Sequence, residues 1–480
     1  MTRSDERPVT DRERTLAVAV VTVALMLEII DGSVVNVAIP HFRDSFGATT
    51  AQIEWISAGY AFFFAVMLIP GGRMGDIFGY RRMFMLGMIG FALASAGCGL
   101  APDARTLIGM RILQGASGAL MGPQILSLVQ VLYAPHERFK VMGIFGLLGG
   151  VAGILGPILG GVLIRADIFG LGWRPIFLIN VPVVAVALVL ALRVLPEGGS
   201  AQRPRLDLTG AALIVPAFAA FLLPLIEGPA LGWPIWLRLM PLLGMILLAA
   251  TAWHLMRRES AGEAVLVPPS VFRSGIFVAG LSIAMIYQLV TGALLIAVSV
   301  MLQSHLGFDA LKTALLHVPF AVGAALSIAV LGRRLLPLMG RQMPLIGVVG
   351  QIAGILLMAH VLGDWQGGSD YALLTAGFAL CGCGMGLISA PLPAFAFARI
   401  PSEHAGAASG VFRASQQLGM AIGIASLGGF FLSRSEVNAA EAIWLLALWQ
   451  VAALLVIAGL SRLLPSDAHR PSPQATAAAS

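Results

Sequence analysis

Two carboxylic acids, Glu28 and Asp31, lie in an apolar stretch near the start of the chain, at residues 15–38. A spacing of three places both side chains on one face of a helix. Burial disfavours the charged form of a carboxyl group, and a neighbouring carboxyl disfavours it further. Such a group can hold a proton near neutral pH and release it when a substrate or a cation approaches. We predict proton coupling here, chiefly at Asp31; the alternatives are a capping or bundle-locking Asp31 and a structural Glu28.

Two arginines, Arg111 and Arg413, also fall inside apolar stretches. A cation in such a place is costly and normally faces a cavity or a counter-ion. We expect Arg111 to set the protonation of the nearby carboxylate, with Gln114 adding a hydrogen bond; a purely structural Arg111 is the alternative. Arg413 either contacts local carbonyl groups or lipid phosphates, or presents its charge to a substrate.

The composition is that of a membrane protein. Of 480 residues, 58% are hydrophobic and only 11% are charged, and the mean hydropathy is +0.89. An ordinary soluble chain is about 25% charged, so too little charge is present to cover several globular surfaces. A soluble enzyme, a nucleic-acid-binding protein and a disordered scaffold are therefore excluded, and no run of basic residues longer than two supports nucleic-acid binding.

Apolar segments long enough to cross a bilayer recur along the whole chain. A helix needs about 20 mainly apolar residues to span the hydrocarbon core. Fourteen segments meet this description, although prolines interrupt the seventh and eighth. They are residues 15–38, 52–71, 83–100, 105–130, 141–164, 175–193, 208–226, 236–255, 275–301, 311–331, 342–362, 371–393, 405–432 and 442–461.

The distribution of Arg and Lys predicts the orientation. The termini and every second loop hold 21 of these residues, whereas the other loops hold 7. Basic residues mark the cytoplasmic side of a membrane protein. We therefore expect a multi-pass protein of the bacterial cytoplasmic (inner) membrane with both termini in the cytoplasm.

The stretch from Gly71 to Arg82 reads GGRMGDIFGYRR. Its glycines permit a tight turn between two helices, and Asp76 can accept from a helix N-terminus or an arginine and so latch two helices together. The pattern resembles motif A of the major facilitator superfamily. The matching residues are Gly72, Asp76, Gly79, Arg81 and Arg82.

Two further stretches resemble motifs of the same superfamily. Arg111, Gln114 and Gly115 resemble motif B. The glycine-rich stretch GILGPILGG at residues 153–161 offers bare backbone for close helix packing, and it resembles motif C, which is associated with the antiporters of the superfamily. The residues concerned are Gly149, Gly153, Gly156, Pro157, Gly160 and Gly161.

The first apolar segment carries a more specific signature. Residues 30–40 read IDGSVVNVAIP and resemble the LDxTVVNVALP motif of the fourteen-helix drug:proton antiporters of the EmrB/QacA type. Residues 173–182 read WRPIFLINVP and resemble the entry to the sixth helix in that family.

The resemblance implies an all-α integral membrane protein with the major facilitator fold: two six-helix bundles plus two linker helices, fourteen transmembrane helices in all. The implied division has five parts. They are a cytoplasmic N-terminal segment at 1–14, an N-terminal six-helix bundle at 15–193, a linker with transmembrane helices 7 and 8 at 194–273, a C-terminal six-helix bundle at 274–463 and a disordered cytoplasmic tail at 464–480.

The implied function is export of lipophilic drugs or related small molecules by alternating access, driven by protons. The proton gradient is the energy source, and no cofactor, metal or enzyme activity is expected. The expected partners are the lipophilic substrate, protons and the lipid bilayer; a periplasmic adaptor protein stays open, and we expect a monomer. Candidates to line the substrate cavity are Asn36, Tyr60, Gln124, Tyr287, Gln288, Gln303 and Arg413.

Other readings of the sequence remain. A proton-coupled transporter of an endogenous metabolite or lipid, either an exporter or a symporter, is the nearer alternative, and motif C argues against import. A membrane enzyme or receptor is the more distant one. The chain lacks the GxxxxGK[ST] loop of nucleotide hydrolysis, and its histidines show no paired metal-ligand spacing.

Overall fold

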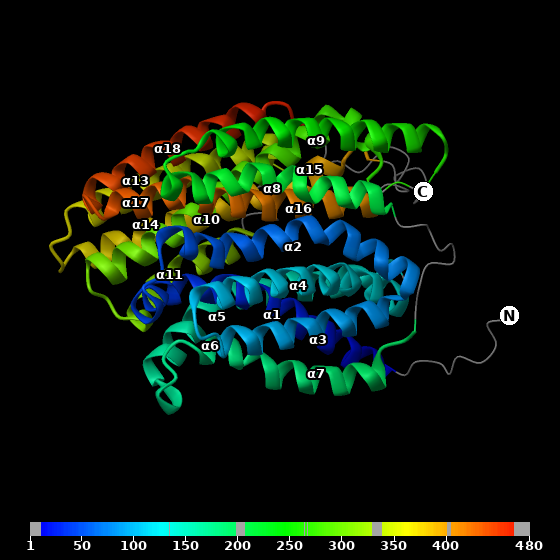
Figure 1. Cartoon of the computed structure of the whole chain (residues 1–480), viewed down its shortest axis with the longest axis horizontal. Coiled ribbons are helices and arrows are strands. Elements are labelled where there is room, and N and C mark those ends of the chain that lie inside the picture. The colour runs from blue at the N-terminus through cyan, green and yellow to red at the C-terminus, as the bar shows by residue number, and fades with distance from the viewer. Residues whose placement is uncertain are drawn as a thin grey trace.

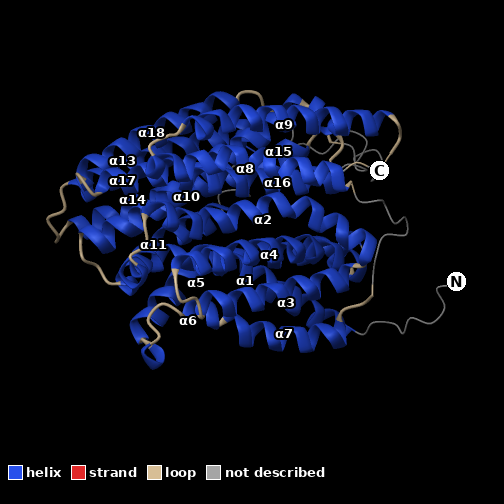
Figure 2. Ribbon diagram, viewed as in Figure 1, coloured by secondary structure: helices blue, strands red, loops and turns tan. Residues whose placement is uncertain are grey.

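The computed structural model describes residues 11–133, 135–197, 207–263, 265, 267–328, 338–400 and 405–464. Within these ranges all regular structure is helical (Figure 2). Figure 1 shows long helices lying side by side along the longest axis of the molecule. Most of the predicted N-terminal segment and all but the first residue of the predicted tail lie outside the described residues.

The first group of helices, which we call the N-terminal bundle, occupies the lower half of Figure 1. In it α2 and α3 both pack on α4, while α1 packs on α5 and α7. The elements are α1 (Asp11–Phe46), α2 (Thr50–Phe78), α3 (Tyr80–Gly99), α4 (Ala104–Leu132), α5 (Pro135–Ala166), the short η1 (Ile168–Gly170), α6 (Pro175–Leu178) and α7 (Asn180–Val194).

The second group, the C-terminal bundle, packs α10 on α16 and α13 on α14 and α18. Its elements are α10 (Gly275–Val300), the π-helix η3 (Met301–His305), α11 (Ala310–Leu326), η5 (Gly340–Gln342), α13 (Met343–Gly363), α14 (Asp370–Ser389), α15 (Leu392–Phe397), α16 (Ala405–Gly423), the π-helix η7 (Ile424–Gly428), α17 (Gly429–Ser435) and α18 (Ala439–Ser461).

Between the bundles in sequence come α8 (Leu208–Leu231), α9 (Ile235–Ser260) and the short η2 (Pro269–Arg273). The helices α8 and α9 pack on each other, and α8 also contacts α2. The prolines do not interrupt α8, which is continuous through Pro216, Pro224 and Pro229. Large apolar side chains of α9 such as Leu239, Leu242 and Ile246 are exposed, as expected of a helix that faces lipid.

Among the described residues, twelve helices are long and apolar enough to cross a membrane. The sequence predicts fourteen. The two predicted segments outside this set correspond to α5 and α11, whose described apolar parts, Val151–Ala166 and Ala310–Leu326, are shorter.

Helix α2 differs from the prediction at its end. The expected turn at Gly71 is helical, and α2 continues to Phe78 before the chain reverses at Gly79 with a φ of 101°. The earlier glycines serve packing instead, because a Cβ atom on Gly71 would collide with the backbone of α4 and Gly72 lies against Pro123 of the same helix. Glycines that read as a turn therefore bring two membrane helices together.

The two bundles meet along a seam formed mainly by α2 against α16 and by α5 against α11. One end of the molecule is tied together by turns from both bundles, and we call it the Trp173 end. There Trp173 donates to the Ser45 hydroxyl at 3.1 Å, and Arg43 pairs with Glu436 of the C-terminal bundle at 3.2 Å. The seam is therefore closed by an ion pair at this end.

Candidate functional site

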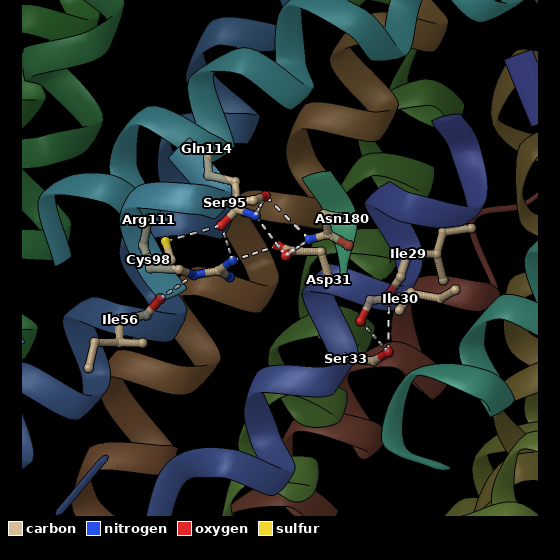
Figure 3. Close-up of polar contacts among 10 residues, drawn as sticks. All are labelled: Ile29, Ile30, Asp31, Ser33, Ile56, Ser95, Cys98, Arg111, Gln114 and Asn180. Atoms are coloured by element: carbon tan, nitrogen blue, oxygen red, sulfur yellow. Dashed lines mark hydrogen bonds and ion pairs between the residues drawn. The ribbon is translucent and has the colours of Figure 1, made fainter. Parts of the chain in front are cut away.

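Asp31 of α1 is fully buried. Its Oδ2 pairs with Nη1 of Arg111 at 2.5 Å, and its Oδ1 accepts hydrogen bonds from the side-chain amides of Gln114 at 2.7 Å and Asn180 at 3.2 Å. Figure 3 shows the three donors converging on the carboxylate. Both carboxylate oxygens therefore have hydrogen-bond partners, as buried polar atoms require.

Arg111 of α4 is 1% exposed, and its guanidinium group has several partners. Besides Asp31, it donates from Nη1 to Oε1 of Gln114 at 2.6 Å and from Nε to the carbonyl oxygen of Ile56 at 3.1 Å. The guanidinium carbon lies 4.1 Å from the centre of the Tyr60 ring. The planar fork of arginine suits several partners at once, and the stacked ring adds a cation–π contact.

Ser95 completes this network from α3. Its hydroxyl oxygen accepts from Gln114 at 2.8 Å and from Asn180 at 3.3 Å. The network thus joins α1, α2, α3, α4 and α7. Removing one partner of such a buried pair strands the other charge, which typically costs about 3–5 kcal/mol, so Asp31 also locks its bundle together.

Glu28 has a different partner from Asp31. It is 6% exposed, and its Oε1 accepts from Nη2 of Arg413 of α16 at 2.9 Å. This ion pair crosses the seam between the bundles. The two carboxyl groups that the sequence places on one helix face thus pair with two different arginines. Arg413 contacts a carboxylate, whereas the sequence suggested carbonyl groups, lipid phosphates or a substrate.

Tyr60 of α2 lies between the two ion pairs. Its hydroxyl is buried without a hydrogen-bond partner, and so is Oε2 of Glu28. Both atoms approach bare backbone of α4, where a Cβ on Gly118 would lie 3.8 Å from the hydroxyl and one on Gly122 would lie 3.2 Å from Oε2. Buried polar atoms without partners are costly, so a polar group that bonded to them would bind favourably.

Comparison with known proteins identifies the family. The profile of the Major Facilitator Superfamily matches residues 21–424. The chain belongs to this superfamily. It is 39% identical over 422 residues to a protein named as the probable actinorhodin transporter of Streptomyces coelicolor, covering 87% of this chain and 72% of that one. It is 33% identical over 425 residues to the puromycin resistance protein of Streptomyces alboniger, covering 87% and 82%.

Solved structures show the same fold. A bacterial homologue of the human lysosomal transporter Spinster, inward-facing and unoccupied, superposes with a TM-score of 0.62 at 18% identity, over 95% of this chain and 97% of that one. A D-xylose–proton symporter gives 0.63 at 16% identity, over 92% and 97%. The chain is accordingly a multi-pass membrane protein with the major facilitator fold.

Motif A of this superfamily member joins α2 to α3. Oδ1 of Asp76 accepts from the Tyr80 hydroxyl at 3.1 Å, while Oδ2 pairs with Arg73 at 3.6 Å. Arg81 donates to a carbonyl oxygen of α7 at 2.5 Å, and Arg82 is exposed. Asp76 therefore ties neighbouring helices of one bundle.

The motif C glycines of α5 face two different neighbours. A Cβ on Gly156 or Gly160 would collide with side chains of α1, whereas one on Gly161 would lie 2.7–3.0 Å from the backbone of α11 across the seam. Gly153 has open space around it. Pro157 lies within α5, and Gly149 lies in a part of α5 whose side-chain surroundings are not described. In motif B, Gly115 allows α4 to approach the backbone of α2 at Tyr60.

The predicted cavity residues lie in different surroundings, although Asn36 and Gln303 share a neighbour, Ser299 of α10. Gln124 is fully buried and donates to the carbonyl oxygen of Gly71 at 2.8 Å, so it joins α4 to α2 instead of lining a cavity. Tyr287 is 2% exposed, and its hydroxyl has no partner. Gln288 is half-buried on α10. The carbonyl oxygen of Asn36 accepts from the Ser299 hydroxyl of α10 at 2.7 Å, across the seam.

Gln303 lines a cavity of about 340 Å³ at the Trp173 end. Both bundles contribute to its wall, and its volume is within the range of small-molecule sites. Its lining residues are Pro40, His41, Asp44, Ile164, Arg165, Gln303, Phe308, Asp309 and Ala310.

Sequence reasoning missed several polar residues of the membrane interior. Asn180 stands in the WRPIFLINVP stretch, which does not indicate a role for this residue, and the sequence around Ser95 carries no recognisable signal. Glu54 of α2 was also missed, although it is 2% exposed. Among the described residues, no group of three or more His, Cys, Asp or Glu side chains is placed to hold a metal ion.

Proposed function

We propose that this protein is a drug:proton antiporter that exports lipophilic compounds across the cytoplasmic membrane by alternating access. The observation that carries the proposal is that the two carboxyl groups of α1 have partners in different bundles. Asp31 pairs within its own bundle, and Glu28 pairs across the seam. A proton on Glu28 would weaken its bond to Arg413. Proton binding on α1 is thereby linked to the movement of one bundle against the other.

The relatives support export over import. They are named for actinorhodin transport, puromycin resistance and, in Mycobacterium tuberculosis, multidrug resistance at 29% identity. These names favour an exporter over a metabolite symporter. Among the described residues few buried acids lie at the seam, and Glu28 is already paired, so neutral or monocationic compounds fit better than dications.

We further propose the fourteen-helix arrangement of the EmrB/QacA type, with both termini in the cytoplasm. The helices α5 and α11 support it, because each packs within its bundle and against the other across the seam. The Trp173 end would then face the outside, and the cavity there would lie on the exit path. The two bundles would be the moving domains, and α8 with α9 the linker.

The test uses everted membrane vesicles with an acid interior, followed by a pH-sensitive dye while puromycin and other lipophilic drugs are added. Wild type should release protons on addition of a transported drug, and Asp31→Asn should not. The matched control is Asp103→Asn, in an exposed carboxyl that caps α4 through Thr106; asparagine caps equally well, so this variant should behave as wild type. Equal responses of wild type and Asp31→Asn would sink the coupling role of Asp31.

A further inference from the structure

Glu54 is a buried acid at the seam that neither ion pair uses. It stands in the second turn of α2, is 2% exposed, and its Oε2 has no hydrogen-bond partner. The carboxyl group lies against Gly429 of α17, where a Cβ atom would collide with it. A carboxyl of the N-terminal bundle is therefore packed against bare backbone of the C-terminal bundle, near the Trp173 end.

The charged groups around Glu54 do not neutralise it. On α8, Glu227 acts electrostatically on Glu54 and accepts from the indole nitrogen of Trp55 at 2.7 Å. The π-helix η7 carries no titratable residue. The cations on the other packed elements have partners or lie elsewhere: Arg43 pairs with Glu436, Arg434 with Glu441, Arg111 with Asp31 and Arg413 with Glu28, while Arg105 is exposed.

An ionised carboxylate buried without a cation is strongly unfavourable. The neutral acid has no such cost, so the packing against Gly429 suits a protonated Glu54. Once ionised, the group would be stable only in contact with water, which requires α2 and α17 to separate. The π-helix that precedes Gly429 is a type of irregularity frequent at functional sites.

We propose that Glu54 is a second proton-binding site, which closes the seam at the Trp173 end when protonated and opens it when the proton leaves. The bound ligand is a proton taken from the aqueous phase at that end. This site differs from Asp31, which bonds only within its own bundle. The inference does not depend on drug export, because it concerns the seam in the absence of any substrate.

The test measures the seam directly as a function of pH. Spin labels are attached at Leu100→Cys and Val437→Cys, which are 72% and 78% exposed and lie on opposite bundles at this end. The native cysteines Cys98, Cys381 and Cys383 are replaced by alanine. Double electron–electron resonance on the full chain in nanodiscs then gives the distance between labels from acidic to alkaline pH, without drug or gradient.

In the labelled wild type, raising the pH should shift the population toward longer distances. The neutral isostere Glu54→Gln should stay at the short distance throughout, and thermal unfolding checks that it folds normally. With Glu227→Gln, loss of the repelling charge should move the midpoint toward lower pH. An unchanging distance in wild type, or an undiminished shift in Glu54→Gln, would overturn the proposal.

A parallel set carries Asp31→Asn. The pH-dependent shift should survive there, because Asp31 belongs to a separate network. If the shift vanished with Asp31→Asn and persisted with Glu54→Gln, the seam would follow Asp31 alone and Glu54 would be only a packing residue. If the protein exported no drug but still showed the pH-dependent shift in label distance, the proposed function would be contradicted and this inference would stand.

Discussion

Both bundles are helical but differ in what they bury. In the N-terminal bundle, five helices meet at a charged network around Asp31 and Arg111. In the described part of the C-terminal bundle, the buried polar side chains make isolated contacts: Gln450 donates to a carbonyl oxygen of α10 at 3.1 Å, and both amide atoms of Gln351 lack partners. Among the described residues of the two bundles, the buried acids therefore all lie in the N-terminal bundle. The C-terminal bundle contributes Arg413 as the partner of Glu28.

This asymmetry bears on the proposed coupling between protonation and movement. A titratable network confined to one bundle cannot by itself move that bundle against its neighbour, since both states could keep it intact. Only groups that bond across the seam distinguish the two states. Among the described residues, three acids contact the other bundle: Glu28 through Arg413, Glu436 through Arg43, and Glu54 against Gly429. Of these, Glu28 and Glu54 are buried.

The largest effect is expected for Arg111→Gln, which leaves Asp31 buried without its cation. We expect a loss of about 3–5 kcal/mol in stability together with loss of drug-dependent proton release. Thermal unfolding in detergent measures the first, and the vesicle assay measures the second. In the C-terminal bundle, Gln450→Leu removes a single hydrogen bond and should cost about 0.5–1.5 kcal/mol.

Asp31→Asn added to Arg111→Gln removes the stranded charge. The double variant should regain much of the lost stability but no transport. If Arg111→Gln lost no more stability than Gln450→Leu, the charged network would stabilise its bundle no more than a single hydrogen bond stabilises the other.

A smaller effect is expected at the seam. Arg413→Gln leaves the buried Glu28 without its partner, and Glu28→Gln removes the titratable group. Each should reduce drug efflux by the equivalent of about 1.5–3 kcal/mol, the range for hydrogen bonds to charged groups. Little loss of stability is expected, because Glu28 can bind a proton in Arg413→Gln and because the unpaired Arg413 of Glu28→Gln is 32% exposed.

Efflux measured for both single variants and the double variant tests the coupling. The double variant should be no worse than either single variant, because both break one contact. Additive losses would mean that the two residues act separately.

The motif C glycines provide a third contrast, between the two faces of α5. Gly161→Ala places a methyl group against the backbone of α11, and overpacking of this kind typically costs about 1–3 kcal/mol. Gly153→Ala, on the same helix, meets open space and serves as the matched control. We expect slower efflux and a lower melting temperature only for Gly161→Ala. If both variants behaved alike, close packing at Gly161 would not be needed at the seam.

The sequence predicted the all-helical membrane fold well, because apolar segments of bilayer length and their polar turns are local properties. It also predicted that Arg111 and Gln114 lie near Asp31, since all three stand in motifs tied to known helices. It failed where burial depends on distant residues. In the sequence, Glu54 is a polar residue near the start of a helix, where exposure is expected. It is buried because it packs against Gly429, which is distant in the sequence. The glycines at Gly71 and Gly72 read as a turn because packing needs a partner helix that the sequence does not specify.

The smallest effect is expected in the linker, at Asp207. This residue caps α8 and bonds to His254 at 2.9 Å and Arg258 at 3.1 Å of α9. Burial alone would raise the pKa of Asp207, but the hydrogen bonds from His254 and the Gly210 backbone, with the charge of Arg258, outweigh it and hold the pKa below its ordinary value. A lowered pKa contributes stability above the unfolded value of about 3.9, and this stability is lost as the pH falls through the folded value.

Asp207→Asn should therefore be less stable at neutral pH by about 0.2–1 kcal/mol, the range for partly exposed pairs. The difference from wild type should shrink as the pH falls below about 4, because protonated aspartic acid resembles asparagine. Melting temperatures of both proteins at a series of pH values measure this. If the difference in melting temperature stayed constant to low pH, packing and neutral hydrogen bonds, rather than the charge of Asp207, would hold α8 against α9. The linker would then differ from the N-terminal bundle in holding its helices together without a charged network.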